Sequence, residues 1–321
     1  ILDNMNALRQ LNPGVIANGN ILYQPQNAYR VRWNMNPDTP LPQEEPAGEN
    51  PPDGAIIDYY LSQPAQNISL EILDDQGVLI RKYSNKDTLY SIPKVNIPLY
   101  WIRPQQLLSG AAGAHRFLWD IHYQPLNVPA SYPIAATYMN TAPEETSPWV
   151  LPGIYTVKLT IDGKEYSRKL QVLMDPRVKT SDDELEAVRN LAYICYEGRR
   201  TCMETLNTIA RLKEQLKAIQ ARPGAAGIKE LNELATHLDW LQNSAPGSSD
   251  RGFQKLHDAF AGLFGVINDS DFPPTKQSTE AIINAKSDLL LLLTKWEEIR
   301  DKEITAVNKI LKKRGWGMVG K

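Results

Sequence analysis

The period of the hydrophobic pattern changes near residue 180, and this change limits what the chain can fold into. Before it, apolar residues alternate with polar ones, as in GIYTVKLTIDGKEYSRKLQVLMD at 153–175, where Asp162 and Gly163 give a type I′ turn signal. After it, apolar residues recur every three to four positions. The sequence therefore predicts a β region followed by an α region, with no helix between the strands.

At least six strands are predicted between residues 55 and 175. We expect an antiparallel β-sandwich of the immunoglobulin or fibronectin-III type, because short alternating strands and turn signals are typical of that fold. Two proline-rich insertions that carry aromatic residues, 85–112 and 124–151, interrupt the pattern. The expected strands are AIIDYYL at 55–61, a hairpin at 67–84, a strand at 115–123 and a hairpin at 153–175.

The α region begins at a capping box formed by Ser181 and Glu184, which predicts a helix that continues to about Ala221. Cys195 and Cys202 fall within it, and we interpret them as two small buried side chains. Long first and last helices with shorter ones between them favour an elongated antiparallel helical bundle. The further helices are expected at 228–242, 253–267 and 278–314.

The 321 residues suffice for two ordinary domains, and we divide them into 1–50 (irregular, with a proline-rich linker), 51–178 (sandwich) and 179–321 (bundle). Lys and Arg number 35 against 37 Asp and Glu, which gives no electrostatic reason to expect a nucleic-acid or anionic-membrane partner. The longest apolar run, 289–293, is too short for a transmembrane segment. The start, ILDNMNALRQ, lacks an initiator Met and suggests a mature or trimmed fragment.

The stretch GAHRFLWDIHY at 113–123 concentrates polar groups and raises the question of a catalytic or metal cluster. Strand alternation places Phe117, Trp119, Ile121 and Tyr123 on the inward face, with Arg116, Asp120 and His122 facing outward. The two histidines of the stretch then lie on opposite faces and cannot bind one metal ion. Asp120 and His122 share a face, so we keep them as a candidate polar pair.

No other motif predicts catalysis, a metal or a cofactor: the chain has no HExxH, CxxC, phosphate-binding loop or GxSxG elbow. We therefore expect no catalytic residue, no metal site and no cofactor. Aromatic side chains outside the strands can stack on sugars or anchor a partner domain, or they can cover the sandwich. The candidate binding residues are Trp101, Tyr132, Tyr138 and Trp149, together with Asp120 and His122.

An ordered series of segments resembles a known class of proteins: ILDNMNALRQL, ILYQPQNAYRVRW, IDYYL, HRFLWDIHY, PGIYTVKLTIDGK and DPRV, followed by helices. The chain resembles the C-terminal region of secreted bacterial proteins with BNR-repeat, sortilin-like β-propellers, often described as glycosyl-hydrolase-like. The resemblance implies that residues 1–11 are a propeller remnant, although Asn4 follows Asp3 where the pattern has a second Asp. The Asp-box repeats of the propeller are absent, so no catalytic residue of the class corresponds to a position in this chain.

The resemblance implies that the protein is exported and that this chain has a non-catalytic role. We expect an accessory region that buttresses the N-terminal β-propeller of the same polypeptide and binds a surface protein or a glycan. Two alternatives remain. One is a carbohydrate-binding module that stacks sugars on Trp101 and Trp149, and the other is a hydrolase with a site at the sandwich–bundle junction that uses Asp120 or His122.

Overall fold

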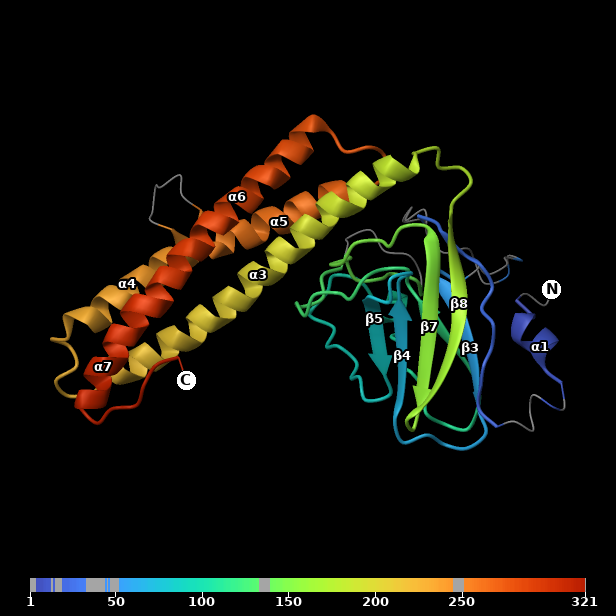
Figure 1. The fold of residues 1–321 in the computed structure, drawn as a ribbon, viewed down its shortest axis with the longest axis horizontal. Coiled ribbons are helices and arrows are strands. Elements are labelled where there is room, and N and C mark those ends of the chain that lie inside the picture. The colour runs from blue at the N-terminus through green and yellow to red at the C-terminus, as the bar shows by residue number, and fades with distance from the viewer. Residues whose placement is uncertain are drawn as a thin grey trace. The chain divides into compact units, whose positions relative to one another are not determined.

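The structure, a computed structural model, describes residues 4–12, 14, 19–32, 44, 46, 52–132, 139–244 and 251–320. The chain divides into two compact units, Ile1–Lys179 and Thr180–Lys321. We call them the β unit and the helical unit and describe each by itself. The predicted order, β first and α second, is confirmed (Figure 1).

The β unit contains two sheets, with strand orders β1-β3-β6 and β2-β8-β7-β4-β5. All neighbouring strands are antiparallel except β2 and β8, which are parallel. A short helix and a 3-10 turn also lie in this unit. The elements are α1 (Asn6–Gln10), β1 (Ile21–Leu22), β2 (Ala28–Arg30), β3 (Ala55–Leu61), β4 (Ile68–Leu73), β5 (Leu79–Ser84), η1 (Leu99–Trp101), β6 (Gly113–Trp119), β7 (Gly153–Ile161) and β8 (Lys164–Met174).

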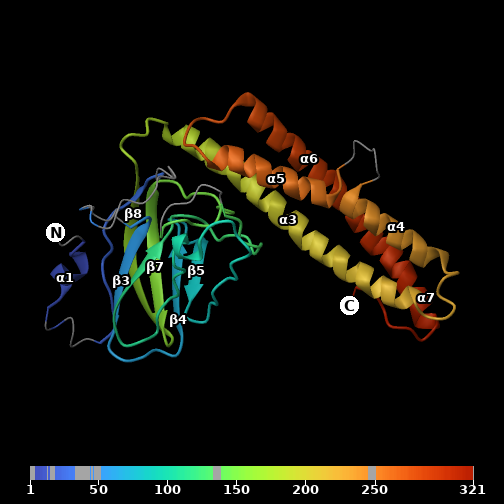
Figure 2. The same ribbon diagram turned by 180° about the vertical axis from the view of Figure 1, so that it is seen from behind.

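Both sheets contribute to one hydrophobic core. Tyr59 and Trp119 come from the three-stranded sheet, and Leu70 and Leu159 come from the five-stranded sheet. Every second residue of β3 and β4 is buried, as the alternation of the sequence predicts. The predicted hairpin is confirmed: β7 and β8 lie side by side in both views (Figures 1 and 2), joined by a turn in which Asp162 and Gly163 have positive φ.

The strand predicted at 115–123 ends earlier than its alternation suggests. β6 stops at Trp119, and Ile121 has a φ of 60°, in the left-handed region. That turn breaks the period-2 pattern, so Ile121 and His122 are both buried while Asp120 is exposed. The expectation that His122 faces outward is therefore wrong: its exposed fraction is 5%.

The helical unit begins at the predicted capping box, in which the Ser181 and Glu184 side chains each bond to the other residue's backbone NH. The last helix, predicted to be continuous, contains a π-helical segment, Ile299–Ile304. Such a segment adds a residue to one turn, which an apolar stripe in the sequence does not reveal. The elements are α3 (Asp182–Gln220), α4 (Lys229–Asn243), α5 (Phe253–Asn268), α6 (Lys276–Glu298), η2 (Ile299–Ile304) and α7 (Thr305–Lys313).

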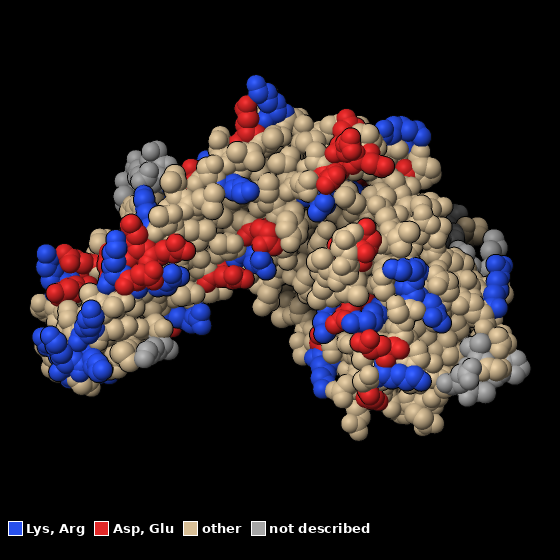
Figure 3. Space-filling model, in the orientation of Figure 1, with Lys and Arg blue, Asp and Glu red and all other residues tan. Residues whose placement is uncertain are grey.

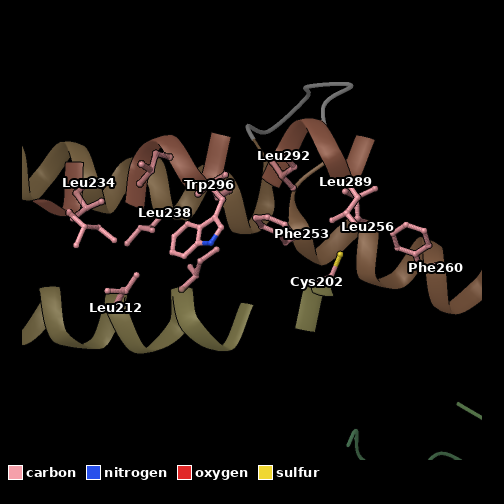
Figure 4. Close-up of a cluster of buried hydrophobic side chains, with 14 of the residues drawn as sticks. Cys202, Leu212, Leu234, Leu238, Phe253, Leu256, Phe260, Leu289, Leu292 and Trp296 are labelled. Atoms are coloured by element: carbon pink, nitrogen blue, oxygen red, sulfur yellow. The ribbon is translucent and has the colours of Figure 1, made fainter. Parts of the chain in front are cut away.

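A second hydrophobic core fills the helical unit (Figure 4). Cys195 and Cys202 are both fully buried and form no disulfide, as predicted. Burial raises the pKa of each thiol to about 12, so the reactive thiolate form is disfavoured. Helices α3 and α5 approach closely where Gly198 faces the ring of Phe260.

Candidate functional site

The structure places the six candidate binding residues in different parts of the β unit. Asp120, His122 and Trp149 lie together, next to Glu145 and two arginines, and we call this group the His122 cluster: Arg30, Arg32, Asp120, His122, Glu145 and Trp149. Trp101 and Tyr132 lie in loops outside that cluster. Tyr138 lies outside the described residues.

Both ring nitrogens of His122 face oxygen atoms. Nε2 lies 3.0 Å from Oε2 of Glu145, and Nδ1 lies 2.7 Å from the backbone carbonyl oxygen of Asp120. The imidazole ring is packed against Trp149, with 3.9 Å between the ring centroids, and the two residues form an antiparallel β-bridge. His122 thus joins the chain segment that carries Glu145 and Trp149 to the end of β6, beside two backbone hydrogen bonds, Tyr123 NH to Pro148 O and Val150 NH to Ile121 O, both 3.0 Å.

Competing effects set the protonation of this histidine. Burial alone lowers the pKa of His122, but the nearby carboxylate of Glu145, with a further contribution from Asp120, outweighs burial and raises it. An oxygen atom beside each ring nitrogen suits an imidazolium, in which both nitrogens carry protons; the Nδ1 contact is a hydrogen bond, and the Nε2 contact is a charge contact without hydrogen-bond geometry. The His122–Glu145 contact is therefore best described as an ion pair between a buried imidazolium and a carboxylate that is 43% exposed.

The other side of the cluster is cationic. Arg30 is buried and donates from Nη1 to the carbonyl oxygen of Val150 at 3.1 Å. The guanidinium carbons of Arg30 and Arg32 lie 5.5 and 5.3 Å from the centroid of the Trp149 ring, within cation–π distance. Trp149 is only 7% exposed, so the expectation that it offers an open stacking platform is wrong.

The cluster lacks the contact that a serine-type hydrolase requires. Ser147 is the buried hydroxyl closest in sequence to Trp149, but its Oγ donates to the carbonyl oxygen of Tyr123 at 2.8 Å. A nucleophilic serine instead forms a hydrogen bond to its histidine base. The contacts of the cluster join the segment that carries Glu145 and Trp149 to the end of β6.

We expect the stability of the β unit to fall as the pH rises from about 6.5, the ordinary pKa of histidine. A folded-state pKa above the unfolded one gives stabilisation that is complete at low pH and is lost as the pH passes the raised value. Urea unfolding at pH 6, 7.5 and 9 measures this. His122→Gln should flatten the dependence, whereas an unchanged slope in that variant would contradict the ion pair.

A different group, on the loop between β5 and β6, is strongly exposed. Five large apolar side chains of this loop have exposed fractions between 43% and 67%. Isolated exposed leucines are common on protein surfaces, but several in one ordered loop indicate an interaction surface. We call this group the loop surface, and it consists of Leu89, Tyr90, Leu99, Tyr100 and Leu107.

The loop that carries this surface is fixed to the β unit. The backbone NH of Tyr90 donates to the side chain of Gln105 at 2.8 Å, and the Gln105 amide donates back to the Tyr90 carbonyl at 2.9 Å. Tyr132 donates to the Tyr90 hydroxyl at 3.3 Å. Ile102 is buried and pairs with Thr141 in a β-bridge. These contacts hold the backbone at several points, so the exposed side chains are carried on an ordered loop.

The sequence pattern indicated Trp101 and Tyr132 near this surface but not its leucines. Leu89, Leu99 and Leu107 follow neither a strand period nor a helix period. The only local signal was their position in a proline-rich insertion, which predicts a loop and hence exposure. Trp101, which is partly exposed, and Tyr132 border the loop surface.

Across the described ranges, no group of three or more His, Cys, Asp or Glu side chains is arranged to hold a metal ion. Within the same residues, no helix is both long enough and apolar enough to cross a membrane.

Comparisons with known proteins give no family. No family model and no curated protein matches the chain. Among solved structures, CopC from Methylosinus trichosporium OB3b aligns at 12% identity over 40% of this chain and 81% of that protein, with a TM-score of 0.20. A structure named pT26-6p aligns at 10% identity over 76% of this chain and 47% of the other, with a TM-score of 0.12. Similarities of this degree carry no argument about fold or function.

Proposed function

We propose that this chain is a non-catalytic accessory region of an exported protein, which docks a neighbouring β-propeller of the same polypeptide. The β unit would be an immunoglobulin- or fibronectin-III-like sandwich, and the helical unit an elongated antiparallel bundle. Two sheets that share one core support the first assignment. The ordered segments that resemble BNR-repeat, sortilin-like proteins support the class and the export.

The loop surface is the observation that carries this proposal. A sugar-binding platform is built from flat aromatic rings with polar groups around them, because a sugar ring stacks on an aromatic face. Leu89, Leu99 and Leu107 cannot stack in this way, and they alternate with Tyr90 and Tyr100 along the loop. A mixture of aliphatic and aromatic side chains instead resembles the apolar centre of a protein–protein interface. The composition therefore favours a protein domain over a glycan.

The proposal is tested with the polypeptide encoded directly upstream of Ile1, produced separately and titrated against this chain by calorimetry. Leu99→Ser/Tyr100→Ser should weaken binding by about 30-fold or more, since truncating hot-spot residues near the centre of an interface costs about 2 kcal/mol or more. The control, Leu290→Ser/Leu291→Ser, changes two side chains of α6 that are 56% and 66% exposed. It should leave binding unchanged.

Three results would contradict the proposal. The first is an upstream reading frame that encodes no propeller. The second is an upstream domain that does not bind. The third is an equal loss of affinity in both double variants.

A glycan-binding role is the second candidate, because Tyr100 is 67% exposed and Trp101, its neighbour in the chain, is partly exposed. Two adjacent aromatic rings at an ordered turn, η1, could stack on a sugar. In that case Leu99→Ser alone should leave glycan binding intact, whereas Tyr100→Ala should abolish it. A glycan array on these two variants separates the candidates.

A further inference from the structure

Basic residues gather at one end of the helical unit. The segments 217–229 and 309–320 together contain seven Lys or Arg residues and no Asp or Glu. The chain has a net charge of −2 with these seven included, so the rest of it carries −9. In Figure 3, blue side chains gather at the end of the helical unit where α7 lies. We call this end the basic tip: Lys217, Arg222, Lys229, Lys309, Lys312, Lys313 and Arg314.

The two segments of the basic tip are in direct contact. Arg314 donates from Nη1 to the carbonyl oxygen of Gly224 at 3.3 Å. Trp316 receives the guanidinium groups of Arg222 and Arg314, at 5.7 and 5.5 Å from its ring centroid. The two segments, and with them Arg222 and Arg314, therefore meet at the same end of the helical unit.

The cations of the basic tip are exposed, and most have no acidic partner. All seven side chains are exposed, and Lys229 pairs with Glu233 at 3.2 Å. None of the other six forms an ion pair within the part of the chain that the structure describes. Lys312 and Lys313 in the last turn of α7 stabilise the helix dipole, but such an effect needs one or two charges, not seven. The excess indicates an anionic partner.

The side chains around Trp316 favour a lipid surface over a nucleic acid as the anionic partner. Two guanidinium groups already lie over the indole ring, so a nucleic-acid base would have to displace them in order to stack. Met318, two residues later, is 39% exposed. A tryptophan and an apolar side chain among lysines and arginines form the combination that settles at a lipid–water interface.

We propose that the basic tip binds the surface of an anionic membrane, peripherally and reversibly. Lysine and arginine side chains near such a surface gain attraction to the lipid headgroups, while the exposed side chain of Met318 contacts the interface. The surface is separate from the loop surface of the β unit, so this inference does not depend on the proposed docking function.

The test is sedimentation of the whole chain with lipid vesicles at about 50 mM salt, where electrostatic attraction is weakly screened. We expect binding to phosphatidylcholine vesicles that contain phosphatidylglycerol, no binding to pure phosphatidylcholine, and release at high salt. Lys312→Gln/Lys313→Gln should lower the partition coefficient about 30-fold, from about fivefold for each cation. The matched control, Lys86→Gln/Lys94→Gln, removes the same charge from exposed positions of the β unit and should bind normally.

Several outcomes would overturn the inference. Failure to bind the anionic vesicles is one, and an equal loss in the control variant is another. Binding to a homopolymeric RNA or to a polyglutamate peptide, without binding to vesicles, would assign the surface to a different partner. All four lysines are exposed, so we expect each variant to fold. Circular dichroism of each variant checks this.

Discussion

Replacing Gly54 with alanine is expected to lower the free energy of unfolding of the β unit by about 4 kcal/mol, from backbone strain and overpacking together. Gly54 has a φ of 119°, a backbone conformation that residues with a Cβ atom rarely adopt. The added Cβ would lie 3.0 Å from the carbonyl carbon of Trp119 and closer still to its oxygen. Those atoms are backbone at the end of β6, so they cannot rotate away.

The control for this prediction is Gly77→Ala. Gly77 has a φ of 80°, but an added Cβ would meet no atom within 4 Å. The Gly77→Ala variant therefore has the backbone strain without the steric clash, and we expect its free energy of unfolding to fall by about 1 kcal/mol. Urea unfolding followed by tryptophan fluorescence measures both. An equal loss of unfolding free energy in the two variants would contradict the close approach of Gly54 to the backbone of Trp119.

Gly198→Ala is expected to destabilise the helical unit by about 2 kcal/mol, although alanine is the better helix former. Gly198 lies inside α3, and an added Cβ would lie 2.5–2.7 Å from three ring carbons of Phe260. Phe260 is fully buried in the core, so its ring cannot move without disturbing its neighbours. The overpacking cost therefore exceeds the gain in helix propensity of about 1 kcal/mol.

Two other glycines provide a control, because alanine at either position should stabilise the helical unit. Gly262 and Gly265 lie inside α5, and an added Cβ at either would meet no atom within 4 Å. Each should gain about 0.5–1 kcal/mol on substitution by alanine, from helix propensity alone. Thermal unfolding by circular dichroism compares the three variants. Stabilisation by Gly198→Ala would contradict the packing of α3 against α5.

The elements that could be predicted from sequence are those determined by local chemistry. The β7–β8 hairpin follows from strict alternation and from Asp162-Gly163, which tolerate positive φ. The start of α3 follows from the reciprocal hydrogen bonds of Ser181 and Glu184. Both signals depend on residues within a few positions of one another, so a single sequence contains them.

The His122 cluster could be predicted only in part, because its contacts join distant segments. Alternation assigned His122 to the outer face, and one residue with positive φ, Ile121, reversed that assignment. Its partner Glu145 is in a loop with no periodic signal, and Arg30 comes from near the start of the chain. Such convergence is a property of the tertiary fold.

The position of the basic residues on the folded chain also could not be predicted from the sequence. The balanced total gave no reason to expect an anionic partner, because an average over 321 residues conceals where the charges lie. The fold brings 217–229 and 309–320 together, where Trp316 contacts Arg222 and Arg314 donates to the carbonyl oxygen of Gly224. The π-helical segment Ile299–Ile304 likewise has no counterpart in the apolar stripe of the last helix.

Hydrogen exchange of backbone amides tests the central claim, that the loop surface docks a propeller of the same polypeptide, most directly. The experiment compares this chain alone with a longer protein that also carries the proposed propeller, encoded before Ile1. The account predicts that amides of 88–107 exchange at least about tenfold more slowly in the longer protein, because docking covers Leu99 and Tyr100. Equal exchange of 88–107 in the two proteins would contradict it.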